Sequence, residues 1–156
     1  MNEDEAERTV TTSAGLRLSL IAESHQRLTG RPLLAVAEVT GPALWRAPLV
    51  LLAHGGGPDP VFFYGNCWAL NLFEVTAQQL LAMHSRLSAE ADVRAERARL
   101  LEAVSRQGFI DDYAGVRVSR TGRRFRIERA TVWNLIDAHG GVHGQAATFA
   151  TWTPLA

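Results

Sequence analysis

The chain has 156 residues, a length that suits one domain with one core. Its 16 basic residues, all arginine, balance 16 acidic ones, so no net charge attracts nucleic acid or an anionic membrane. The longest apolar stretch, residues 47–53, is too short to span a membrane, and the acidic N-terminus does not fit a secretory signal. The single cysteine, Cys67, excludes an internal disulfide. We therefore expect a cytoplasmic protein that binds neither nucleic acid nor membrane.

The first third of the chain is expected to be helical after a polar start. Residues 1–13 carry acidic and small polar side chains, which predicts a disordered tail. A helix is expected from Ala14, ended by Gly30, and a short one near Pro42. Residues 14–46 are therefore assigned to an N-terminal helical extension.

Two strands and two short helices are expected next. Residues 48–53 form a short apolar run and residues 61–64 are aromatic and β-branched, and the glycine-rich sequence HGGGPD between them predicts a hairpin. Asn66 is a good helix N-cap, and Thr76 with Gln79 makes a capping box that opens a further helix.

The last part of the chain is expected to hold a longer helix and three strands. Ser88 is expected to cap the helix, whose apolar face includes Val93, and Gly108 to end it. The strands are expected at residues 109–119, 123–136 and 142–152.

The turn at Thr121-Gly122 sets the expected faces of these strands. It places Val118 opposite Phe125, and alternation then gives one face toward the helices and the cavity: Val116, Val118, Phe125, Ile127, Thr131, Trp133 and Leu135. The opposite face is expected to carry Arg117, Arg124, Arg126, Glu128 and Tyr113. Apolar residues on that opposite face, Ala130, Val132 and Ile136, are expected to be covered by the N-terminal helix or by a second subunit.

The element order predicts an α+β fold. We expect a PAS-like five-stranded antiparallel sheet with short helices on one face and an N-terminal helix, in which the first strands pair with the last. The domain itself is placed at residues 47–153.

Four blocks of sequence carry a resemblance to a known family. They are LAHGGGPDPVFFYGNCWALNLFE (52–74), SRLSAE (85–90), ERARLLEAVSRQGFIDDYAGVRVSRTGRRFRIE (96–128) and ATVWNLID (130–137). Together they resemble the MEKHLA-domain family, which is related to PAS domains. These domains occur at the C-terminus of class III homeodomain–leucine zipper plant transcription factors and as stand-alone bacterial proteins. The resemblance implies the stand-alone bacterial type and a sensory or ligand-binding role, with no ligand named.

Three candidate ligand-binding residues lie in the first hairpin and just after it. His54 ends a buried strand beside three glycines, where it could contact a ligand or bind haem iron, or simply cap the strand end in water. Tyr64 or its neighbour Phe63 faces inward, and a buried hydroxyl needs a partner. Asn66 is a candidate as well, although a helix cap explains it first.

Four further candidates lie in the second half of the chain. Ser85 and Arg86 precede the long helix, where the arginine could clamp a carboxylate or pair with Asp111 or Asp112. Trp133 belongs to the expected helix-facing side of its strand. Gln145 is a plausible cavity-lining amide, with a facing that depends on the length of the preceding turn.

Metal and flavin binding are not expected. His139 and His143 are four residues apart in a glycine-rich turn without further ligands, so we predict no metal site. The triplet Gly65-Asn66-Cys67 looks like the photoactive motif of light-sensing flavin domains, but here it directly follows the second strand. A cysteine that behaves as a small hydrophobe is the better interpretation, and the cofactor is left open.

These observations support a PAS-like small-molecule-binding or sensory module that acts through a homodimer or a partner protein. The alternative is a small enzyme that uses the same cavity, with His54, Tyr64 and Arg86 in acid–base or anion-binding roles. A third alternative is an interaction module with a filled core.

Overall fold

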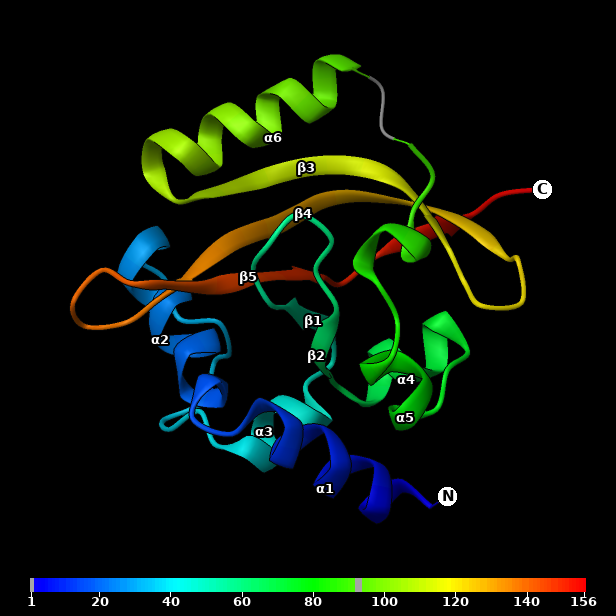
Figure 1. Cartoon of the computed structure of the whole chain (residues 1–156), viewed down its shortest axis with the longest axis horizontal. Coiled ribbons are helices and arrows are strands. Elements are labelled where there is room, and N and C mark those ends of the chain that lie inside the picture. The colour runs from blue at the N-terminus through cyan, green and yellow to red at the C-terminus, as the bar shows by residue number, and fades with distance from the viewer. Residues whose placement is uncertain (1, 92–93) are drawn as a thin grey trace.

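A computed structural model describes residues 2–91 and 94–156 and confirms the expected α+β architecture (Figure 1). Its strands run in the order β2-β1-β5-β4-β3, all antiparallel, and β6 pairs with β4 beside this path. The strands are β1 (Val50–His54), β2 (Phe62–Gly65), β3 (Phe109–Val118), β4 (Arg124–Ile136), β5 (Val142–Phe149) and β6 (Trp152–Pro154). The predicted last strand, residues 142–152, is therefore divided into two, because the long β4 takes β6 as its partner beyond the end of β5.

Helices cover both faces of this sheet. They are α1 (Glu3–Ala14), α2 (Arg17–Thr29), α3 (Gly41–Arg46), α4 (Cys67–Phe73), α5 (Ala77–Leu81), the 3-10 helix η1 (Ser85–Ser88) and α6 (Arg94–Gln107). In Figure 1, α6 lies along β3, α2 lies beside the turn between β4 and β5, and α1 and α3 lie farthest from α6. We call the face that carries Phe125 the inner face, since Phe125 contacts Phe73 of α4. The face that carries Trp133 is the outer face, where Trp133 Nε1 donates to the carbonyl oxygen of Ile21 in α2 at 3.0 Å.

The predicted disordered tail is instead the helix α1. Asn2 caps it by accepting a hydrogen bond from the backbone of Glu5 at 2.8 Å. Val10 and Ala14 are buried, and Ala6 packs against the core one turn earlier. This spacing of four residues places three small apolar side chains on one stripe, against β2 and α5. The polar composition of residues 1–13 suggested disorder, but this apolar stripe holds α1 against β2 and α5.

The long helix begins later than predicted. Ser88 does not cap it, because Ser85–Ser88 form η1 and the described part of α6 starts at Arg94. Val93, which was expected on its apolar face, lies outside the described residues.

The expected register of β3 and β4 is wrong by one residue. Their turn spans residues 119–123 and is closed by a hydrogen bond from the backbone nitrogen of Ser119 to the carbonyl oxygen of Arg123 at 2.8 Å. Arg117 therefore pairs with Phe125, and Val118 pairs with Arg124. Because side chains alternate along a strand, this shift places Arg117 on the inner face and Val116 and Val118 on the outer one.

A second irregularity corrects the predicted faces of β4. Arg129 has a positive φ of 56°, and the pairing with β3 is irregular on either side of Tyr113 and Ala130. After this bulge Val132 lies on the inner face, paired with Ala147, whereas Trp133 lies on the outer face. The prediction that Trp133 shares the face of Phe125 is thus corrected. Ala130 and Val132, expected outside, are buried on the inner side.

Asn66 fixes β1 to its surroundings through four hydrogen bonds. Its side-chain oxygen accepts from the backbone nitrogens of Leu51 and Ala69, each at 3.1 Å. Its amide nitrogen donates to the carbonyl oxygens of Leu44 at 3.2 Å and Leu49 at 2.8 Å. The side chain is fully buried, so every one of its polar groups is used within the fold.

We predict that Asn66→Ala lowers the free energy of unfolding by about 3 kcal/mol, since it leaves several buried backbone groups without partners. Asn71→Ala is the matched control, because Asn71 lies on the same helix and is exposed. Urea denaturation followed by circular dichroism measures both. Equal stability of the two variants would contradict the structural role of Asn66.

Candidate functional site

A cavity of about 530 Å³ opens where the β1–β2 turn meets η1, α6 and the start of β5. Its walls include the backbone of Gly55, Gly56 and Gly57, which lets the chain approach a bound molecule closely. The charged and polar side chains that line it are His54, Asp59, Ser85, Arg86, Arg97, Asn134 and Gln145. We call this the outer chamber.

A smaller chamber of about 150 Å³ adjoins it under the inner face of the sheet. The two chambers share His54, Ser85, Leu100 and Gln145 among their lining residues. Most of the remaining wall of this inner chamber is apolar or aromatic: Leu52, Phe62, Tyr113, Val132, Ala146 and Ala147. Arg117 also lines it, as a consequence of the corrected register.

A row of three polar residues crosses three neighbouring strands, at the end of β1, where the chambers join. His54 of β1 pairs with Gln145 of β5, which pairs with Asn134 of β4. Directly opposed residues share a face, so the three side chains lie side by side. Gln145 Nε2 donates to Asn134 Oδ1 at 3.2 Å.

The hydrogen bond of His54 fixes how its imidazole meets a ligand. Its Nδ1 lies 2.8 Å from the carbonyl oxygen of Gly55, and since a carbonyl oxygen can only accept, Nδ1 carries the proton. In the neutral ring Nε2 is then an acceptor, and it makes no hydrogen bond to any described residue. His54 therefore presents an available acceptor at the chamber junction.

The described charged side chains of the outer chamber are mostly basic. Arg86 Nε donates to Asp59 Oδ1 at 3.0 Å. Neither acid expected to pair with Arg86 does so, because Asp111 binds Arg31 at 2.9 Å and Asp112 binds Arg99 at 2.7 Å. Arg97 of α6 lines the same chamber. Among the lining residues that the structure describes, two arginines thus accompany one carboxylate.

The structure brings together His54, Ser85, Arg86 and Gln145 of the predicted site and separates the others. Tyr64 pairs with Ala53 on the outer face, and its hydroxyl has no hydrogen-bond partner in the described residues. Burial raises the pKa of Tyr64 well above its usual range, and the nearby Glu7 adds to this. Trp133 lies under α2.

Two lining residues were missed from the sequence, for different reasons. Asn134 interrupts the apolar end of β4, but only the bulge at Arg129 turns it inward. Arg97 lies one helical turn before Leu101 on α6, and both line the outer chamber. A polar residue within an apolar strand was the available signal for Asn134, whereas nothing distinguished Arg97 from other arginines of α6.

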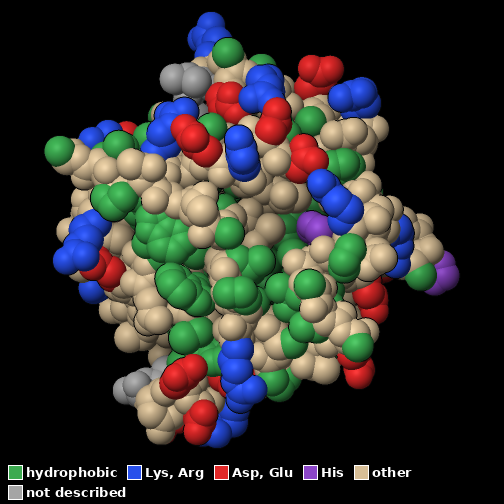
Figure 2. All heavy atoms as spheres, turned by 180° about the vertical axis from the view of Figure 1, so that it is seen from behind, with side chains coloured by type: hydrophobic (Ala, Val, Ile, Leu, Met, Phe, Trp, Pro, Cys, Tyr) green, Lys and Arg blue, Asp and Glu red, His purple; other side chains and the backbone are tan. Residues whose placement is uncertain are grey.

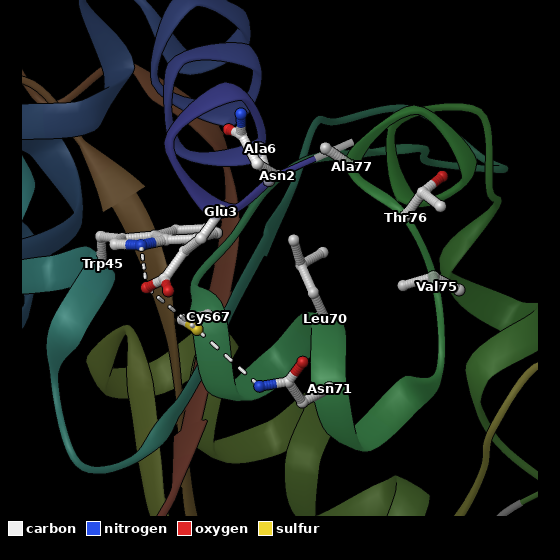
Figure 3. Close-up of a pocket in the computed structure, with 10 residues that line it drawn as sticks. All are labelled: Asn2, Glu3, Ala6, Trp45, Cys67, Leu70, Asn71, Val75, Thr76 and Ala77. Atoms are coloured by element: carbon white, nitrogen blue, oxygen red, sulfur yellow. Dashed lines mark hydrogen bonds between the residues drawn. The ribbon is translucent and has the colours of Figure 1, made fainter.

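A second cavity, of about 310 Å³, lies between α1 and the α4–α5 segment (Figure 3). In Figure 3 the side chains of Glu3, Trp45 and Cys67 point toward one another. The carboxylate of Glu3 accepts a hydrogen bond from Trp45 Nε1 at 3.2 Å and one from the thiol of Cys67 at 3.7 Å. Since these polar groups already satisfy each other, the chambers at His54 are the better candidate site.

Cys67 lies apart from the chambers under the sheet. It is the first residue of α4, and it lines the cavity beneath α1. Burial, followed by the charge and hydrogen bond of Glu3, raises the pKa of its thiol. A thiol of this kind is a weak nucleophile, which agrees with the interpretation of Cys67 as a packing residue.

The histidine-containing turn between β4 and β5 is organised by a carboxylate. Asp137 accepts hydrogen bonds from the His143 ring at 2.7 Å and from the backbone nitrogens of Gly141 at 2.9 Å and His139 at 2.8 Å. These bonds, that of His143 first, lower the pKa of Asp137 to about 2. Within the described ranges, no three His, Cys, Asp or Glu side chains gather as they would around a metal ion.

This turn predicts an acid-dependent stability. A carboxylate whose pKa is lower in the folded chain than in the unfolded one stabilises the fold above the unfolded pKa. The contribution of Asp137 should therefore be complete above about pH 4 and be lost as the pH falls toward about 2. Thermal melts of the wild type and Asp137→Asn should differ by a constant amount above pH 5 and converge below pH 4. If the difference in melting temperature between the two proteins did not change with pH, the lowered pKa of Asp137 would be contradicted.

The sheet and its helical cover define the class of protein. Solved structures with this fold include the fungal blue-light photoreceptor Vivid as a light-state dimer, at 13% identity and a TM-score of 0.58, over 82% of this chain and 91% of that one. A PAS domain from Colwellia psychrerythraea matches at 11% identity and a TM-score of 0.56, over 73% of this chain and 92% of that one. At such identities the likeness shows the fold alone, which is that of PAS and light-oxygen-voltage domains.

The sequence then identifies the family. The family model for the MEKHLA domain matches residues 16–154, a span that takes in α2 and α3 as well as the sheet. The chain therefore belongs to the MEKHLA domain family, as its sequence blocks predicted.

Its curated relatives are much longer plant proteins. The homeobox-leucine zipper protein HOX9 of Oryza sativa subsp. indica is 30% identical over 142 residues, which are 85% of this chain and 16% of that protein. The homeobox-leucine zipper protein ATHB-9 of Arabidopsis thaliana is 33% identical over 98 residues, 61% of this chain and 11% of that protein. This chain thus spans less than a fifth of either relative.

Proposed function

We propose that the chain is a sensory module that binds a small molecule in the outer and inner chambers. The observation that carries this proposal is the polar row of His54, Gln145 and Asn134 at the chamber junction. A sheet face that packs under helices is ordinarily apolar, and here three half-buried polar side chains stand side by side on it, with Nε2 of His54 making no hydrogen bond to any described residue. A ligand in contact with the row would hydrogen-bond to these groups.

The size and lining of the chambers support the same proposal. Ligand sites are typically concave, of roughly 300–1,000 Å³, with an apolar wall and a few convergent polar groups. The outer chamber, at about 530 Å³, lies within that range, and the inner chamber adds the apolar wall.

The two alternative functions have less support. An enzyme that uses His54, Tyr64 and Arg86 requires the three groups to converge, and Tyr64 lies on the outer face. An interaction module with a filled core requires that the space under the inner face be occupied by side chains, and two chambers open there. Haem binding through His54 stays a prediction, which an absorption spectrum of the purified protein tests.

We further propose that the signal passes through a homodimer. Hydrophobic side chains gather across the middle of the face shown in Figure 2. Trp68 is 46% exposed and meets the ring of Trp152 at 5.8 Å, which in turn meets Phe149 at 6.0 Å. An aromatic cluster with one exposed member, Trp68, is typical of a protein–protein contact.

Several predictions about the cellular context stay predictions. No helix in residues 2–91 or 94–156 is long and apolar enough to cross a membrane. A cytoplasmic location, the absence of nucleic-acid and membrane partners, and the stand-alone bacterial type are retained as proposals on the charge balance and the sequence resemblance alone. The activities of the homeobox-leucine zipper proteins are not transferred to this chain.

Ligand binding is tested by native mass spectrometry of the purified protein and by a fragment library that contains neutral and anionic compounds. We expect compounds that bind, and we expect Gln145→Leu to weaken their binding about tenfold, the effect of losing one hydrogen bond of about 1.4 kcal/mol. Gln26→Leu, the same substitution at an exposed position of α2, should leave binding unchanged. A library without any binder would overturn the proposal.

The homodimer is tested by sedimentation equilibrium. The wild type should sediment as a dimer and Trp68→Arg as a monomer, because a buried arginine without a partner is costly at an interface. Gln26→Arg is the control, since Gln26 is an exposed polar residue of α2 and its substitution adds the same charge without removing an exposed hydrophobe. A wild type that remains monomeric at every concentration would refute this mode of signalling.

A further inference from the structure

We infer that the ligand of this site is a small aromatic carboxylate, with its ring in the inner chamber and its anionic group between Arg86 and Arg97. The inference rests on the proposed function and adds the chemical class of the ligand. Three features of the chambers carry it: the balance of charge, the size of the apolar part, and the way the chambers connect.

The charge of the outer chamber favours an anion. Within residues 2–91 and 94–156, Arg86 and Arg97 line it together with one carboxylate, that of Asp59. Asp59 occupies only Nε of Arg86, at 3.0 Å, and also lies 3.2 Å from Nδ1 of His84. The two terminal amino groups of Arg86 make no hydrogen bond to any described residue.

That open edge suits one chemical group in particular. The paired N–H groups at the end of a guanidinium match the two oxygens of a carboxylate in a bidentate contact. Arg97 makes no ion pair with any described residue, so its charge is also available. Asp59 holds Arg86 in place from the other side, which reduces the entropy lost when a ligand binds.

The volume of the inner chamber limits the apolar part of the ligand. At about 150 Å³, lined mainly by side chains such as Leu52, Phe62 and Val132, it is comparable to an apolar protein cavity that holds a single benzene. One six-membered ring matches this volume.

The connection between the chambers allows one molecule to use both. His54, Ser85, Leu100 and Gln145 line both spaces, so a ring inside and a carboxylate outside need only a short link between them. The link would pass the polar row, beside Nε2 of His54.

The first experiment compares probes of matched shape on the full chain at constant ionic strength. Benzoate and phenylacetate carry both parts, benzamide has the ring without the charge, and acetate has the charge without the ring. Titration of the ¹⁵N-labelled protein, followed by NMR, should show at least one aromatic carboxylate binding ten times or more tightly than benzamide and acetate.

The second experiment uses variants at each end of the site. Arg86→Gln should weaken the aromatic carboxylate at least tenfold without affecting benzamide. Arg99→Gln is the matched control, because Arg99 is engaged by Glu96 and Asp112 outside the chambers. Ala147→Leu should fill the ring chamber and abolish binding, with Ala147→Val as the milder variant if the larger side chain lowers the melting temperature.

The outcomes separate this inference from the proposed function. Equal affinity for benzoate and benzamide, or an Arg86→Gln variant that binds as the wild type does, would overturn the anionic class while compounds still bind. If acetate bound as tightly as phenylacetate, the claim that an aromatic ring occupies the inner chamber would be overturned. If neither these probes nor any compound of the fragment library binds, the proposed function fails together with the inference.

Discussion

The pairing of the first strand with the last one is the constraint on which the rest of the structure depends. β1 pairs with β5 from Val50 opposite Phe149 to His54 opposite Gln145, which joins the two halves of the chain in one sheet. Gly144 permits this contact, because it has a φ of 134° and a Cβ there would collide with the carbonyl oxygen of His54. The glycine-rich turn and the start of β5 consequently meet at one point, and the outer chamber opens there.

Two other elements hold β1 in this position. Asn66 accepts a hydrogen bond from Leu51 and caps α4, so it fixes the strand to the helix that follows the first hairpin. On the outer face α2 covers the sheet, with Trp133 hydrogen-bonded to its backbone. Helix α2 and the polar row are therefore on opposite faces of the sheet, and the chambers form on the inner face beside η1 and α6.

Capping boxes, glycines and apolar runs predicted the helices and strands and their order. Which face of the sheet a side chain lies on depended on turn lengths and a bulge, which these local signals do not reveal. The Thr76–Gln79 capping box and the left-handed Gly30 lie where the sequence predicted them. The five-residue turn at residues 119–123 and the bulge at Arg129 each shift the alternation by one residue, which moved Arg117 and Trp133 to unexpected faces. His54 and Gln145 were predictable because the turn glycines mark the strand ends, while the inward facing of Asn134 depends on the bulge.

The central claim is that a small molecule occupies the space at the end of the β1–β5 pair rather than the cavity beneath α1. Residue-resolved NMR shifts with phenylacetate bound test it most directly. We expect the largest shifts at the backbone amides of Gly55 and Gly144 and at the side-chain amides of Asn134 and Gln145. Shifts that instead concentrate at Cys67, Asn71 and Val75 would contradict the account.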